Sequence, residues 1–166
     1  MEILGIDVLS AVGGAAASAI TFGIRSVMIA PVKAATDRAR FIRGLSVIFP
    51  RKPFDGLWEV TWHVNGSRLA NENTDQVSIH AVLGNVTFTT NTVLLDGGKE
   101  KCVFVGKLSE RTLTGRWYDP KDEGRGYFGV FQVTLHGSLN HGSGYWSGWS
   151  SNGQVQSNKM TLKRLG

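Results

Sequence analysis

Cysteine is nearly absent from this sequence, since Cys102 is the only one among 166 residues. A single thiol excludes an internal disulfide and a zinc site built from cysteines. Cys102 lies in the apolar run 102–105, where a buried and unreactive thiol is the expected state. The cysteine usage therefore gives no sign of an oxidising compartment.

Motifs for catalysis and for metal binding are also missing. The chain contains no glycine-rich phosphate loop, no G-x-S-x-G and no HExxH motif. Paired carboxylates occur only in the stretch DPKDE (119–123), which Pro120 and Gly124 mark as a solvated loop. We therefore expect a protein that is not an enzyme and that has neither a metal site nor a cofactor.

The positive charge is confined to one short segment. Between Arg25 and Pro53 there are seven basic residues and one acid, Asp37, whereas from Phe54 onward eleven basic residues face ten acids. Proteins that bind nucleic acids usually spread positive charge over the face of a domain. No nucleic acid is therefore expected as a partner, in spite of the net charge of +5.

A long uncharged run lies near the N-terminus. Residues 8–24 carry no charge, and the apolar stretch continues past Arg25 to Ala30, close to the length of about 20 residues that a membrane-spanning helix needs. Acids precede the run and basic residues follow it, which predicts an N-terminus outside and the rest in the cytoplasm. We assign residues 1–31 to a membrane anchor; a core helix and an interfacial helix are the alternatives.

Two further features accompany this segment. The pairs Gly13/Ala17 and Gly14/Ser18 have the spacing that lets helices associate in lipid, although small residues can also be ordinary filler. Residues 32–53 form a basic, partly amphipathic connector whose arginines are expected to contact anionic headgroups. The sequence thus predicts a homo-oligomer that associates through its N-terminal helix.

From Phe54 to Gly166 the pattern changes to short alternating runs with turn residues about ten positions apart, which is typical of an all-β barrel or sandwich. Hairpin-like joints predict an eight-stranded up-and-down (lipocalin-like) β-barrel as a ligand-binding domain at 54–166. Strands are expected at 56–64, 76–83, 85–95, 100–108, 111–119, 126–136, 143–150 and 156–165.

Hydrophobic alternation predicts which side chains face the interior. The expected inward sets are Trp58, Val60, Trp62 and Val64; Leu113, Gly115 and Trp117; Tyr127, Gly129, Phe131, Val133 and Leu135; Met160 and Leu162. The stretch GYWSGWSSNG (144–153) carries aromatics on both faces, so its phase stays open, and its Asn-Gly pair predicts a tight turn.

Tryptophan and tyrosine are more numerous than a core of this size needs. Aromatic rings beside arginine suit a planar, anionic ligand such as a nucleotide. The candidate ligand-binding residues are Trp62, Arg116, Trp117, Tyr118, Arg125, Tyr145 and Trp149. The alternative is that these aromatics only fill the barrel.

The chain combines an apolar N-terminal segment, a basic connector and a predicted barrel. The barrel sequence begins with GLWEVTW and contains GYWSGWSS near its end. The chain resembles the membrane-anchored minimal β-barrel effectors of bacterial cyclic-oligonucleotide antiphage signalling (CBASS), which are analogous in role to STING. The resemblance implies a cyclic dinucleotide bound in the barrel, oligomerisation and disruption of the inner membrane. Such effectors usually have two membrane helices, whereas only one candidate is found here. The alternative function is a membrane-tethered, lipocalin-like carrier or interaction module for an apolar small molecule or a partner protein.

Overall fold

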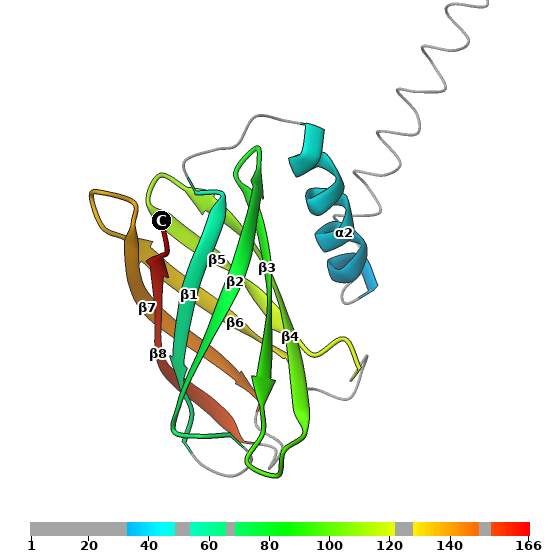
Figure 1. The fold of residues 1–166 in the computed structure, drawn as a ribbon, viewed down its shortest axis with the longest axis vertical. Helices are drawn as coiled ribbons and strands as arrows, with labels where there is room; N and C mark the ends of the chain where they lie inside the picture. The colour runs from blue at the N-terminus through cyan, green and yellow to red at the C-terminus, as the bar shows by residue number, and fades with distance from the viewer. Residues whose placement is uncertain (1–32, 49–53, 66–68, 122–127, 150–153) are drawn as a thin grey trace, which may run out of the picture.

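In a computed structural model, the described residues are 33–48, 54–65, 69–121, 128–149 and 154–166 (Figure 1). One described helix precedes eight strands. These elements are α2 (Lys33–Ile48), β1 (Gly56–His63), β2 (Glu72–Val82), β3 (Asn85–Val93), β4 (Lys99–Ser109), β5 (Thr112–Tyr118), β6 (Phe128–Leu135), β7 (His141–Trp149) and β8 (Val155–Arg164).

The strands form a closed antiparallel barrel in the order of the sequence. Each strand pairs with the next, and β1 also pairs with β8 to close the barrel (Figure 1). The prediction of an eight-stranded up-and-down barrel is therefore confirmed. Closure leaves no edge strand exposed along the paired segments, which is the usual solution to edge-to-edge association.

The observed strand ends differ from the predicted ones by a few residues, and the earlier starts of β2 and β7 change the connections between strands. β2 begins at Glu72, because its ladder with β1 extends to the pair His63–Glu72. β7 begins at His141, so the joint expected at 140–142 lies at 136–140 instead. The His136 amide donates to the His141 carbonyl at 2.8 Å, and Leu139 takes the left-handed conformation (φ 56°) that the turn requires.

The predicted alternation is confirmed along the described strands; Tyr127, one of the residues expected to face inward, lies outside the described residues. Trp58, Val60, Leu113 and Val133 face inward and are fully buried. On β7 the question of phase is resolved: Trp146 packs against the core, whereas Tyr145 and Trp149 point outward and are exposed. The face of β7 that carries Tyr145 and Trp149 therefore belongs to the outer wall of the barrel. The predicted Asn-Gly turn of this stretch lies outside the described residues.

The end of the barrel at which β1 starts, called here the closed end, is sealed by aromatic packing. The Trp58 indole Nε1 donates to the Phe54 carbonyl at 3.1 Å, and the two rings lie 4.7 Å apart. Arg164 Nη2 donates to the Asp55 carbonyl at 3.1 Å, and the Ala81 amide donates to the Asp55 carboxylate. The strands β1, β3, β5 and β7 end at the opposite end of the barrel, called the loop end (Figure 1).

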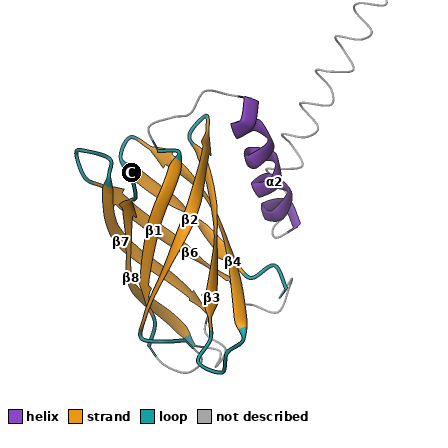
Figure 2. Ribbon diagram, in the orientation of Figure 1, coloured by secondary structure: helices purple, strands orange, loops and turns teal. Residues whose placement is uncertain are grey.

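Helix α2 lies against the outer face of β2, β3 and β4 (Figure 2). Ala39 and Ile42 are buried against an outward-facing apolar cluster, which consists of Val82, Val103, Val105 and Tyr118. Most of the connector predicted at 32–53 is thus the helix α2, which packs on the barrel. Two of its arginines bond to β3: Arg38 Nη2 donates to Asn85 Oδ1 at 2.5 Å, and Arg43 Nη2 donates to Thr89 Oγ1 at 2.6 Å.

The predicted membrane anchor falls within residues 1–32, which lie outside the described residues. Arg125 also lies outside the described residues. In the part of the chain that the structure describes, no helix has the length and apolar character needed to cross a membrane.

Candidate functional site: a polar pocket at the β1–β8 seam

The barrel wall is incompletely paired where β1 meets β8. Their ladder runs from the pair Trp58–Arg164 to the pair Trp62–Met160 and then stops, although β8 begins five residues before Met160, at Val155. We call this unpaired junction at the loop end the seam. Backbone groups that lack a ladder partner must find another one.

Side chains supply those partners across the seam. Gln156 Nε2 donates to the Asn65 carbonyl at 3.0 Å, and the Asn65 amide donates to Gln156 Oε1 at 3.4 Å. The Trp146 indole reaches past β8, and its Nε1 donates to the His63 carbonyl at 2.9 Å. The seam is therefore held by side chains rather than by a backbone ladder.

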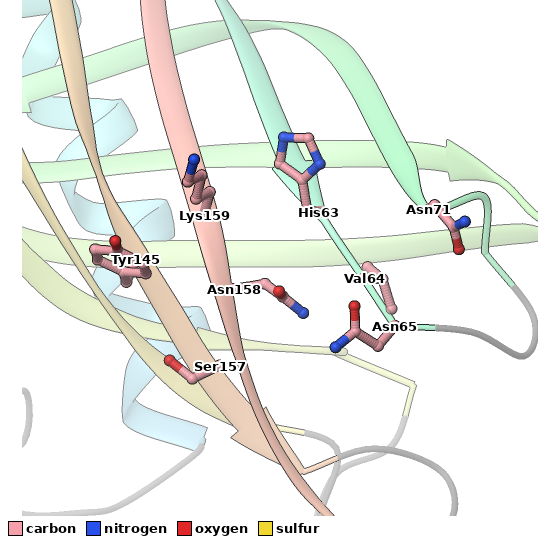
Figure 3. A pocket seen from close by; sticks show the side chains of 8 residues that line it. All are labelled: His63, Val64, Asn65, Asn71, Tyr145, Ser157, Asn158 and Lys159. Atoms are coloured by element: carbon pink, nitrogen blue, oxygen red, sulfur yellow. The ribbon is translucent and has the colours of Figure 1, made fainter.

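A pocket of about 710 Å³ lies at this seam (Figure 3). Its volume is within the usual range for small-molecule sites. The lining residues come from the ends of β1 and β2, from β7 and from β8: His63, Val64, Asn65, Asn71, Tyr145, Ser157, Asn158 and Lys159.

Seven of the eight lining residues carry a polar or charged group, and Val64 is the single aliphatic residue among them. Lys159 is exposed and supplies a positive charge. Tyr145 is 60% exposed, so its ring is available as a stacking surface. His63 Nε2 lies 3.8 Å from the Glu72 carboxylate. This combination suits a ligand with acceptor groups, negative charge and a flat ring.

Asn158 has a special place in this pocket. Its Nδ2 atom is buried and has no hydrogen-bond partner among the described residues. A buried donor left without a partner costs about 1–3 kcal/mol. A ligand acceptor that gains access to this amide, which has almost no accessible surface in the unliganded barrel, would remove that cost, so Asn158 is a candidate recognition group.

Behind the seam, three inward-facing indoles occupy the part of the interior nearer the loop end. Trp117 and Trp146 meet edge to face with ring centroids 5.7 Å apart, and Trp62 packs beside the core. Gly129 and Gly148 make room for Trp117, because a Cβ at either position would lie within 2.4 Å of its indole. These glycines explain why a large side chain fits inside a narrow barrel.

Cys102 also faces the interior. Burial, and then the nearby Glu100 and Asp119 carboxylates, raise the pKa of its thiol well above the usual value. Cys102 Sγ lies 3.8 Å from Glu100 Oε1. The thiol is therefore protonated at neutral pH, in agreement with the unreactive state expected from the sequence.

The structure does not gather the six described candidates for ligand binding into one site. Trp62 and Trp117 face the interior, whereas Tyr118 faces outward and is buried in the cluster beneath α2. Arg116, Tyr145 and Trp149 are exposed on the outer wall, and Arg125 lies outside the described residues. Tyr145 is the one of the six described candidates that lines the seam pocket.

Sequence reasoning missed most of the pocket lining. His63, Asn65, Asn71, Asn158 and Lys159 carry no motif, and they come together because the β1–β8 ladder ends at Trp62. The one available signal was the polar joint NGSRLANENTD at 65–75, which supplies Asn65 and Asn71. In the described part of the chain, no group of three or more His, Cys, Asp and Glu side chains is placed to hold a metal ion.

Comparisons with known proteins add solved structures of low similarity. No protein-family model and no curated protein matches the chain. A redesigned β-barrel matches with 18% identity and a TM-score of 0.46, over 68% of this chain and 92% of its own. A second redesigned β-barrel, bound to DFHBI, has 17% identity and a TM-score of 0.44, over 67% of this chain and 94% of its own.

A third match is a mutant of the vaccine antigen Transferrin Binding Protein B from Haemophilus parasuis. It has 12% identity and a TM-score of 0.37, and the aligned part covers 68% of this chain and 26% of the antigen chain.

Proposed function

We propose that this protein is a non-enzymatic ligand-binding barrel that recognises a polar, anionic small molecule of the nucleotide class at the seam pocket. The observation that carries the proposal is the lining of that pocket. Lys159, Tyr145 and the buried Asn158 amide lie around one cavity of about 710 Å³.

Each of these groups has a distinct role in the proposal. The Lys159 ammonium pairs with a phosphate, as a charge-assisted hydrogen bond. The exposed face of Tyr145 stacks on a base, an interaction worth about 1–3 kcal/mol. The unpartnered Nδ2 of Asn158 donates to a carbonyl or ring nitrogen of the ligand.

The finer proposal is that the ligand is a cyclic dinucleotide and that the protein acts as an antiphage effector. It rests on the resemblance to CBASS β-barrel effectors. In this proposal the N-terminal segment anchors the chain in the bacterial inner membrane, the barrel lies in the cytoplasm, and ligand binding promotes homo-oligomerisation and membrane disruption. Protease protection in inverted and right-side-out vesicles tests the orientation.

Calorimetric titration of the full chain in detergent with a panel of cyclic dinucleotides tests the binding site. We expect Lys159→Gln to weaken binding about tenfold or more, because it removes a charge-assisted contact. Lys163→Gln is the matched control, since Lys163 is exposed on the same strand and does not line the pocket. Binding should also weaken at high salt.

Two results would contradict this site. If no cyclic dinucleotide binds a folded barrel, the nucleotide proposal fails. If Lys159→Gln and Lys163→Gln have equal effects, the ligand binds elsewhere.

The carrier function remains the second candidate, and the three inward indoles near the loop end favour it. Trp62 and Trp146 are only partly buried and would offer an apolar surface to a ligand inside the barrel. A carrier of this kind should bind an apolar dye with an affinity that neither salt nor Lys159→Gln changes. A strong dependence of dye binding on either would exclude it.

A further inference from the structure

The outer wall formed by β5 to β8 differs in charge from the rest of the barrel. These four strands contain no aspartate or glutamate, and neither does β3, whereas β1, β2 and β4 each contain at least one. Arg116, Lys159 and Lys163 are exposed on this wall. The wall is therefore positively charged, although the barrel sequence as a whole is nearly neutral.

The same wall exposes large apolar side chains that a soluble β-barrel normally turns inward. Phe128, Val130, Trp149 and Val155 are 48%, 54%, 44% and 63% exposed. Strand pairing brings them together: Val130 lies opposite Arg116 on one side and opposite Ser147 on the other, and Trp149 lies opposite Val155. We call Arg116, Phe128, Val130, Trp149 and Val155 the β5–β8 patch, with Tyr145 and Lys159 at its border.

Helix α2 does not cover this patch, since it packs on β2, β3 and β4. Apolar side chains clustered on a folded surface mark an interaction site. The patch lies toward the loop end, where β6 begins and where β7 meets β8 (Figure 1).

We propose that the β5–β8 patch docks the barrel on an anionic lipid bilayer. Tryptophan and tyrosine favour the bilayer interface, where the ring is partly apolar and the polar tip stays hydrated. Phe128, Val130 and Val155 enter the acyl boundary, and Arg116 pairs with lipid phosphate. The absence of carboxylates from these four strands removes the repulsion that an anionic surface would otherwise create.

The composition of the patch favours a bilayer over a single-stranded nucleic acid. Stacking platforms for bases require aromatic rings along a basic groove. Val130 and Val155 would have no partner in such a complex, although they are among the most exposed apolar residues of the wall. In lipid, by contrast, each of them gains from leaving water.

Tryptophan fluorescence of the full chain on lipid vesicles tests the docking. Vesicles of brominated phosphatidylcholine, with or without added phosphatidylglycerol, quench indoles that reach the acyl boundary. We expect stronger quenching when phosphatidylglycerol is present and a loss of the difference at high salt. Trp149→Phe keeps the patch apolar and should remove most of the quenchable signal, because Trp149 is the one tryptophan exposed on the outer wall and the other four pack in or against the core.

Variants of the patch give the quantitative test. Arg116→Gln should lower the ratio of docked to undocked barrels about fivefold, the effect of one basic residue at an anionic surface, and Phe128→Ser should lower it as well. Leu83→Ser is the matched control, since Leu83 is 75% exposed in the β2–β3 turn, away from the patch. Neither Arg116 nor Phe128 lines the seam pocket, so nucleotide binding should survive both changes.

Three outcomes would overturn the proposal. The first is quenching that does not depend on phosphatidylglycerol or is equally reduced by Leu83→Ser. The second is a patch that binds a single-stranded oligonucleotide more strongly than it binds the vesicles. The third is a Phe128→Ser variant that changes the oligomeric state in ultracentrifugation but leaves quenching unchanged, which would make the patch an interface between copies of the chain.

Discussion

Trp117 depends on two residues that have no side chain. Its indole lies against Gly129 of β6 and Gly148 of β7, where a Cβ would come within 2.4 and 2.2 Å of it. Trp146 then meets Trp117 edge to face. At the scale of single residues, packing of the interior near the loop end thus depends on the two glycines as much as on the aromatic rings.

This arrangement predicts the effect of adding one methyl group. Gly148→Ala would place Cβ 2.2 Å from Trp117 Cζ2 and 2.8 Å from the Phe128 carbonyl oxygen. Since the second contact is with the backbone, a side-chain rotation cannot relieve it, and we expect a loss of about 1–3 kcal/mol in the free energy of unfolding. Urea denaturation measures this change.

Gly137→Ala is the control for that measurement. The nearest atom to its Cβ would be Arg111 Nη1, at 3.9 Å. An exposed substitution of this kind should change stability by less than about 0.5 kcal/mol. Equal losses in the two variants would show that Trp117 is not packed as described.

At the scale of elements, α2 contacts the barrel through a histidine, among other residues. Ser46 Oγ lies 3.3 Å from His80 Nδ1, on the outward face of β2. Burial lowers the pKa of His80, the positive charge of Arg43 lowers it further, and Asp55 opposes the shift. Neutral His80 is therefore the form that the packed helix favours.

The sign of the pH dependence follows from that lowered pKa. The stabilising contribution is complete above 6.5, the usual pKa, and is lost as the pH falls through the lower value of the folded state. We expect hydrogen exchange at Ala39 and Ile42, corrected for the intrinsic effect of pH, to become faster under mildly acidic conditions. His80→Gln should remove this acceleration; an unchanged profile in that variant would assign it to another group.

The elements also show what the sequence could and could not reveal. Alternation at Trp58, Leu113 and Phe131 was sufficient to place the strands and their inward faces, because side-chain direction in a strand follows from position alone. The packing of α2 was not predicted, since basic residues obscure the short apolar stripe of Ala39, Ile42 and Leu45. The polar joint at 65–75 was the only sequence signal for the seam pocket, and the place of the pocket could not be predicted, because it depends on where pairing between the first and last strands ends.

At the scale of the whole molecule, the folded unit begins earlier than the barrel itself. The sequence suggested a ligand-binding domain at 54–166, but α2 buries Val82, Val103, Val105 and Tyr118 on the outside of that barrel. Without the helix these side chains would form an exposed apolar surface on β2, β4 and β5, which favours association.

Truncation tests this boundary. A chain that starts at Phe54 should be less stable by at least about 2 kcal/mol than one that starts at Lys33, since it uncovers several apolar side chains. It should also associate at high concentration. Urea midpoints and sedimentation measure the two effects, and equal midpoints would mean that α2 contributes nothing to the stability of the barrel.

The short ladder between β1 and β8 has a consequence for the order of folding. Every other ladder joins neighbours in sequence, so each can form as a local hairpin, whereas Trp62 and Met160 lie at opposite ends of the barrel sequence. Closing so long a loop has a high entropic cost, and it comes after the hairpins have formed. Backbone pairing between β1 and β8 is confined to the part of the junction near the closed end. We therefore expect the β1–β8 junction to be the last part of the barrel to form and the first to open. We also expect the junction of the first and last strands to influence the lifetime of the native state as well as the shape of the pocket.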